Sequence, residues 1–175
     1  MLTMTPTLPV QHLDPGYIAA HIDERFRPFF LISAADIPIA MKDTIDALCV
    51  AVNLFGERIR FRVAKHLVVG GSPFNIELAS GSLSYTPKKE TIHVNIEEYI
   101  FLDVNKAQAL SKNIRIATFM EEFVHAFMNI TDEDLTAKVV CLIYPQVQFI
   151  EGQYFDIGAI AEPSAFGLPA SQTIP

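Results

Sequence analysis

Hydrophobic residues that recur every three or four positions over residues 33–55 predict the first long helix. The apolar stripe consists of Ile37, Met41, Ile45, Leu48, Val52 and Phe55. Ser33 and Asp36 have capping-box spacing, and Gly56 follows the last apolar residue as a stop signal. Because proline is tolerated only in the first turn of a helix, Pro38 favours a start near that residue.

The hydrophobic period then changes to strict alternation in the stretch RIRFRVAKH, residues 58–66. Alternation of this kind predicts a half-buried strand. Its apolar face would carry Ile59, Phe61 and Val63, and its basic face Arg58, Arg60 and Arg62. A solvated sheet face explains the basic row. The alternative is a regulator that binds an acidic partner through these arginines.

Further strands are predicted between residues 75 and 96. A short strand covers 75–78, and the segments SLSY and TIHVNI form a hairpin joined by TPKKE. The second arm of this hairpin has Thr91, His93 and Asn95 on its polar face. A lone histidine on such a face is typical of a surface residue, and we interpret His93 in this way.

Two helices are predicted after the strands. The first runs from about Lys106 to Asn129, and the second is capped by Thr131 and ends at Pro145. The first turn of the second helix is acidic, with Asp132, Glu133 and Asp134. The order helix, strands, helix, helix predicts an α+β domain over residues 33–150.

The segments on either side of this domain are predicted to be extended arms. Residues 1–32 contain four prolines, and residues 151–175 form the C-terminal arm. Within it, the stretch 156–175 has only two charged side chains, Asp156 and Glu162, among scattered apolar residues. Disordered tails are normally rich in charge. We therefore expect the arms to bind protein partners or to mediate self-association.

The composition narrows the function classes. A formal net charge of −7 argues against nucleic-acid binding, which depends on basic residues. No apolar stretch approaches the roughly 18 residues of a membrane helix, and the N-terminus lacks the pattern of a signal peptide. We expect a soluble protein that is cytoplasmic where it is synthesised. Cys49 and Cys141 have no CxxC spacing and are interpreted as small buried hydrophobes in a reducing compartment.

The candidate chemistry lies in the helix that contains TFMEEFVHAF, residues 118–127. Its polar residues fall within an arc of roughly 100° on a helical wheel. They are Thr118, Glu121, Glu122, His125 and Asn129. The structural interpretation is the solvent face of an amphipathic helix. The chemical interpretation is a metal site, because residues 118–130 contain no Lys or Arg, whereas ordinary wet faces mix both signs.

The spacing within this stripe matches that of a zinc-binding helix. Glu121 and His125 are four residues apart, so their side chains reach the same spot on one face. Zinc helices of the HExxH type use this spacing for two ligands and place the general base next to the first. Glu122 stands at the position of that base, and the motif here is EExxH.

The stretch RIATFMEEFVHAF followed by DEDLTAKVVCLIYP resembles the minimal gluzincin metallopeptidases of the ImmA/IrrE-like type, often carried by phages. Arg115 opens the family's lead-in, and LIYP matches its closing run. The resemblance implies a minimal zincin-like domain: a helix, a small twisted sheet, an active-site helix and a second helix. It also implies metal ligands at Glu121, His125 and Asp134, with Glu133 as the neighbouring candidate for the third, and Glu122 as catalytic base.

Glu121 departs from the family pattern, which has histidine at this position. A carboxylate there lowers the Lewis acidity of a bound metal, so we expect zinc to be weakly bound or absent. Without metal, Glu121 pairs with protonated His125. The leading hypothesis is a degenerate metallopeptidase site on a structural or protein-interaction module of a larger assembly, such as a phage virion. The alternative is an active zinc endopeptidase. The other histidines, His12, His21, His66 and His93, have no ligand spacing.

Overall fold

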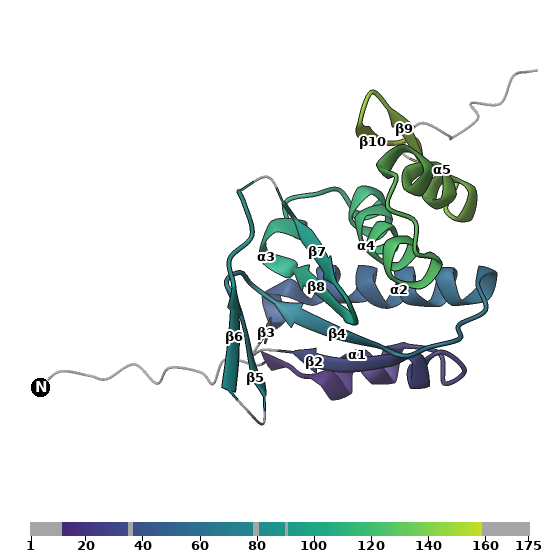
Figure 1. Cartoon of the computed structure of the whole chain (residues 1–175). Coiled ribbons are helices and arrows are strands. Elements are labelled where there is room, and N and C mark those ends of the chain that lie inside the picture. The colour runs from purple at the N-terminus through teal and green to yellow at the C-terminus, as the bar shows by residue number, and fades with distance from the viewer. Residues whose placement is uncertain (1–11, 35–36, 79–80, 90, 159–175) are drawn as a thin grey trace, which may run out of the picture.

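The computed structural model describes residues 12–34, 37–78, 81–89 and 91–158, which form an α+β fold around a four-stranded mixed sheet (Figure 1). The strand order is β2 (Phe30–Ala34), β4 (Lys65–Gly70), β8 (Tyr99–Asp103) and β7 (His93–Ile96). The first three strands run parallel, and β7 is antiparallel to β8. Strand β7 is therefore an edge of the sheet in the described part of the chain.

Five α-helices accompany this sheet in the described residues. They are α1 (Pro15–His21), α2 (Lys42–Arg58), α3 (Val104–Ala107), α4 (Lys112–Met128) and α5 (Glu133–Ile143), with 3-10 turns at Arg27–Phe29 and Ile39–Met41. Helix α4 packs against β7 and β8 on one side and against α2 and α5 on others (Figure 1). None of these helices has the length and apolar character needed to cross a membrane.

Three two-stranded sheets complete the described fold. They pair β1 (His12–Leu13) with β3 (Ile37–Pro38), β5 (Phe74–Leu78) with β6 (Gly81–Tyr85), and β9 (Val147–Ile150) with β10 (Gln153–Asp156). The predicted strand at 75–78 is thereby confirmed. The hairpin prediction is wrong, because β6 pairs with β5, while β7 pairs with β8. Strand β8, YIFLD, is an apolar run typical of a buried central strand.

Residues 12–32 belong to the folded domain and are not an arm. Helix α1 is capped by the Asp14 side chain, and Pro15 stands at its start, where proline is favoured. Ile18 and Ile22 are fully buried, and Phe30 leads into the sheet. The prolines of this segment therefore stand at helix starts and do not indicate an extended chain. The remaining arm predictions fall on residues 1–11 and 159–175, outside the described residues.

Helix α2 begins at Lys42 and ends at Arg58, so the predicted span 33–55 is shifted. Residues 33–41 contain the end of β2, the short strand β3 and a 3-10 turn, where Ile37 is buried opposite Leu13. Gly56 does not stop the helix. A side chain at this position would meet the Phe26 ring at 2.5 Å, so glycine is required for close packing.

The strand predicted at 58–66 is also wrong. Residues 59–64 form a loop between α2 and β4, and strand pairing begins at Lys65. The reason is tertiary: Phe61 enters a cluster of phenylalanine rings and is buried, while Val63 stays 54% exposed. The alternating pattern reflects one anchored ring among exposed arginines, not a pleated strand.

The two predicted C-terminal helices are present with corrected boundaries. The stretch from Lys106 is interrupted at residues 108–111, and α4 starts after the Ser111 cap. Helix α5 is capped by Asp132 rather than Thr131, through a hydrogen bond from the Leu135 N–H to its carboxylate. Residues 151–158 are not free arm either, because β10 pairs with β9.

Candidate functional site

Helix α4 carries the predicted site, and Arg115 holds the turn that leads into this helix. The buried Arg115 guanidinium donates hydrogen bonds to three backbone carbonyls, those of Ala107, Gln108 and Leu110. These carbonyls belong to the turn between α3 and α4. Arg115 therefore has a structural role, holding the turn from which the helix starts.

The polar stripe of α4 is largely covered, so its interpretation as a solvent face is wrong. Thr118 is 9% exposed, and its hydroxyl donates to the Arg115 carbonyl at 3.0 Å. Glu121, Glu122 and His125 are half-buried. Side chains from β7, β10 and the first turn of α5 contact these three residues.

Glu122 is held by the edge strand. The Asn95 side-chain amide on β7 donates to the Glu122 backbone carbonyl at 3.0 Å and also to its carboxylate. Burial first, and then the neighbouring charges of Glu121 and Glu133, raise the pKa of Glu122 to about 8 against the opposing effect of the Asn95 hydrogen bond. The predicted general base is therefore mostly protonated at neutral pH.

Glu121 is held by the C-terminal hairpin. The Tyr154 hydroxyl on β10 donates to its carboxylate at 3.3 Å. Burial is the main cause that raises the pKa of Glu121 to about 7, and the charge of Glu133 acts in the same direction. Burial also raises the pKa of Tyr154. The two adjacent glutamates thus lie in a setting that favours their neutral forms.

His125 is oriented by the backbone. Its Nδ1 lies 2.6 Å from the Ile130 carbonyl oxygen, so Nδ1 carries the proton and donates it. Its Nε2 faces α5 and lies 3.4 Å from the Glu133 carboxylate, whose side chain is 75% exposed. Of the two acids predicted near His125, Glu133 is the one that contacts it. Asp134, the next residue on α5, is exposed.

The side chains as placed do not form a metal centre. In the part of the chain that the structure describes, no three His, Cys, Asp or Glu residues are grouped so that they could hold a metal ion. The two glutamates are instead bonded to Tyr154 and Asn95. A zinc ligand set of Glu121, His125 and Asp134 stays a prediction.

A cleft with a volume of about 490 Å³ opens beside these residues. Its walls come from the edge strand β7, the second half of α4 and the connection to α5, together with Lys65 at the start of β4. Glu122, His125 and Glu133 line one side of it, and Val94 and Asn95 line the other. The cleft thus runs between a sheet edge and a set of carboxyl and imidazole groups.

His93 is buried, contrary to its interpretation as a surface residue. It is 7% exposed, and its ring lies against the Phe119 ring at a centroid distance of 4.9 Å. Its Nδ1 accepts a hydrogen bond from the Asp103 N–H, and burial lowers its pKa to about 3. The polar face of β7 points toward α4, because this strand lies on the helix and not on solvent.

Sequence reasoning missed two residues of this site, Asn95 and Tyr154. Asn95 had a usable signal, since it lies with His93 on the polar face of a predicted strand. Tyr154 had none, because it lies in a segment interpreted as an arm.

Comparison of the chain with protein-family models, with curated proteins and with solved structures gives no match.

Proposed function

We propose that this protein is a zincin-like domain with a degenerate metallopeptidase site, and that it acts as a protein-interaction module in a larger assembly. An extended segment of a partner protein would pair with the edge strand β7 and lie along the cleft. The resemblance to a family common in phages makes a virion the assembly that we propose.

The observation that carries this proposal is the position of α4 under an unpaired strand edge. In the described residues β7 pairs only with β8, so one row of its backbone groups is available to another chain. Strand addition to such an edge is a general mode of peptide recognition. The cleft beside β7 supplies space for alternate side chains of the added strand.

The state of the two glutamates supports the degenerate site. Burial raises the pKa of Glu122 to about 8, so a neutral carboxyl can be held inside the fold without a cation beside it. Tyr154 and Asn95 satisfy the carboxylates by hydrogen bonds. The covered glutamates then contribute to the floor of the binding cleft rather than to catalysis.

One observation favours the second candidate, an active zinc endopeptidase. Because His125 Nδ1 donates to the Ile130 carbonyl, Nε2 keeps its lone pair and faces Glu133. This is the tautomer that a metal-binding histidine uses. In that case His125, Glu121 and one acid of α5 would hold zinc, which would supply Lewis-acid chemistry.

Zinc titration with a chromophoric chelator separates the two candidates. We compare the wild type with Glu121→His and use Glu121→Ala as the control. If the site is degenerate, the wild type binds zinc weakly. Restoring the second imidazole should then tighten binding at least about tenfold, which corresponds to about 1.4 kcal/mol. Glu121→Ala should show no gain.

A peptide-binding assay completes the test. A library of extended peptides is screened for binding to the wild type and to an Asn95→Pro variant, since proline removes one of the backbone N–H groups of β7 that face away from β8. Asn95→Ala controls for the loss of the side-chain hydrogen bonds to Glu122. Tight stoichiometric zinc together with peptide cleavage by the wild type would contradict the degenerate site. Equal peptide binding by Asn95→Pro and Asn95→Ala, with both folded, would contradict strand addition at β7.

A further inference from the structure

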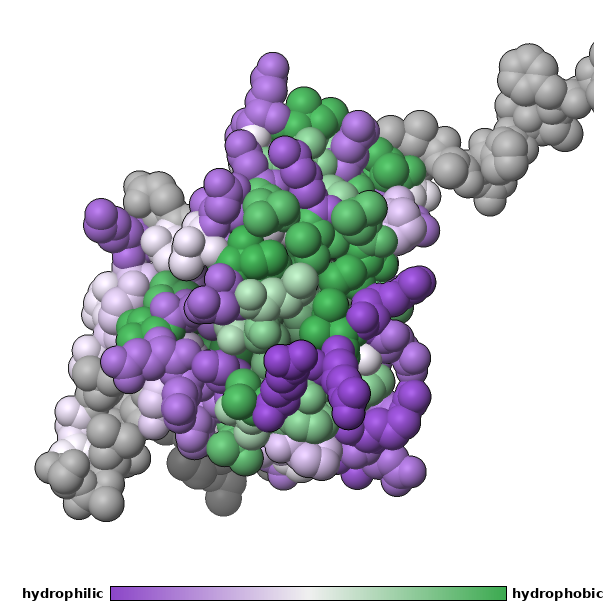
Figure 2. Space-filling model, turned by 45° about the vertical axis from the view of Figure 1, so that its right-hand side comes forward, coloured by the Kyte–Doolittle hydropathy of each residue, from purple (hydrophilic) through white to green (hydrophobic). Residues whose placement is uncertain are grey.

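One end of the molecule carries an exposed basic loop. Residues 59–64 connect α2 to β4 at the end that lies on the right in Figure 1 and comes forward in Figure 2. Phe61 anchors this loop in the core, with its ring centroid 4.8 Å from that of Phe127 and 5.1 Å from that of Phe29. Arg60 and Arg62 flank the anchored ring and are exposed.

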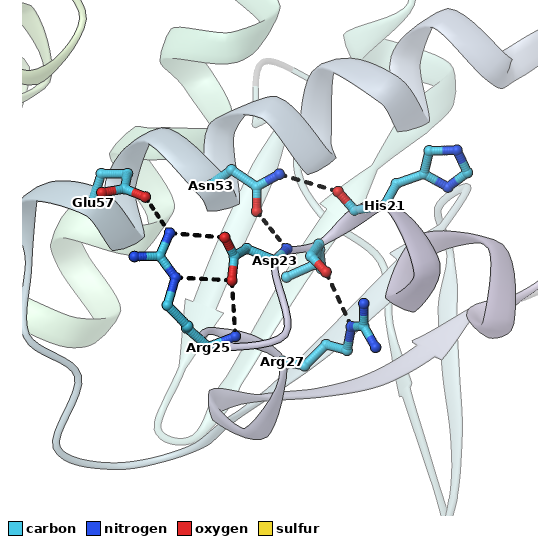
Figure 3. Close-up of polar contacts among 7 residues, drawn as sticks. His21, Asp23, Arg25, Arg27, Asn53 and Glu57 are labelled. Atoms are coloured by element: carbon cyan, nitrogen blue, oxygen red, sulfur yellow. Dashed lines mark hydrogen bonds and ion pairs between the residues drawn. The ribbon is translucent and has the colours of Figure 1, made fainter.

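The arginines of this loop have no partner within the described part of the chain. The side chains of Arg60 and Arg62 in the loop, and of Arg58 at the end of α2, make no hydrogen bond or ion pair there. The nearby acids are already used, as Figure 3 shows: Arg25 pairs with Asp23 at 2.8 Å and also with Glu57. The loop therefore presents up to three uncompensated positive charges to whatever approaches this end.

An acidic group lies at the same end of the molecule. Phe61 contacts Phe127 in the last turn of α4, and α5 begins five residues after that turn ends. The cap and first turn of α5 carry three exposed acids, Asp132, Glu133 and Asp134. The basic loop and the acidic turn thus both lie on the side of the molecule that carries the last turns of α4.

Apolar side chains are exposed on the same elements. They are Val63 at 54%, Met128 at 36%, Leu135 at 48% and Leu142 at 83%. Figure 2 shows a hydrophobic area on this side of the molecule, bordered by strongly hydrophilic residues. An apolar area with a charged rim is typical of a protein–protein interface.

We propose that this end is a self-complementary surface through which two copies of the chain associate. In a two-fold pair, the arginine loop of one copy faces the acidic start of α5 in the other, and the reverse contact forms at the same time. The exposed apolar residues meet near the axis. A second copy of the chain is an acidic partner, because its formal net charge is −7. The same net charge disfavours binding to nucleic acid.

Sedimentation equilibrium with two charge-reversed variants tests this pairing. Arg60→Glu/Arg62→Glu makes the loop acidic, like the start of α5. Asp132→Asn/Asp134→Lys leaves the loop basic and makes the start of α5 neutral. Asparagine keeps the cap of α5. Each variant alone should associate at least about tenfold more weakly than the wild type. An equimolar mixture should form more one-to-one dimer than either variant forms alone, because the acidic start of α5 in the first variant again faces an intact arginine loop in the second.

The matched control for the arginine variant is Lys88→Glu/Lys89→Glu. It makes the same change in net charge at exposed positions in the connection between β6 and β7, far from this end. It should leave dimerisation unchanged, and the wild-type dimer should weaken between 50 and 500 mM salt, conditions chosen around the Debye screening range. Circular dichroism verifies that each variant is folded. A wild type that stays monomeric at about 100 μM protein and low salt overturns the proposal. Failure of the mixture to form a heterodimer overturns it as well.

Discussion

Replacing Glu122 by glutamine removes an ionisable group from under strand β7 while keeping its shape. In the folded protein, burial raises the pKa of Glu122 from its ordinary 4.5 to about 8. The folded state therefore retains a proton that the unfolded chain releases. Stability conferred by the neutral carboxyl is complete below about pH 4.5, and it is lost as the pH rises toward 8.

The size of this loss follows from the pKa change. One pKa unit corresponds to about 1.4 kcal/mol, so ionising Glu122 in an unchanged structure costs up to about 5 kcal/mol. Water entry and partial exposure reduce this cost, and Glu121 titrates in the same range. We expect Glu122→Gln to be more stable than the wild type by about 2 kcal/mol at pH 8 and equal to it near pH 5.

Urea unfolding at four values between pH 5 and pH 8 measures the difference. The matched control is Glu24→Gln, which removes the same charge from an exposed position in the described fold. It should follow the wild type at every pH. If Glu122→Gln shows the same pH dependence as the wild type, the carboxyl is ionised in the folded protein. That result would contradict the neutral, buried state of Glu122, and its carboxylate would be available as a general base.

Three further outcomes are expected from the packing of the domain. Gly56→Ala should destabilise the protein by about 1–3 kcal/mol, because the added methyl meets the Phe26 ring, and thermal unfolding measures the loss. Phe61→Ala should cost about 3–5 kcal/mol in urea unfolding, since its ring fills the aromatic cluster; a cost under about 1 kcal/mol would contradict the anchoring role. Truncation after Phe155 should destabilise the domain, because it removes Asp156, which accepts hydrogen bonds at the start of α4. Truncation that removes only 159–175 should leave the melting temperature unchanged and weaken any association that the arm mediates.

The sequence determined the local features whose causes lie within a few residues. The acidic run 132–134 predicts a helix start with Thr131 as its cap, and the structure has the start one residue later with Asp132 as the cap, because a carboxylate beside free backbone N–H groups is a local interaction. The α+β class, the strand at 75–78 and the spacing of Glu121 and His125 on one helix follow from the same short-range rules. These predictions needed no knowledge of distant residues.

The tertiary structure decided which faces are buried and which segments pair. The alternation around Phe61 predicts a strand, but five distant phenylalanine rings hold this residue in a loop. His93 and the stripe of α4 are polar and typical of a surface, yet His93 packs on Phe119 of α4, and Glu122 of the stripe accepts a hydrogen bond from Asn95 of β7. Glu133 rather than Asp134 contacts His125, because this choice depends on where α5 lies relative to α4. Burial depends on contacts between residues far apart in the chain, so a pattern of polar and apolar positions cannot specify it.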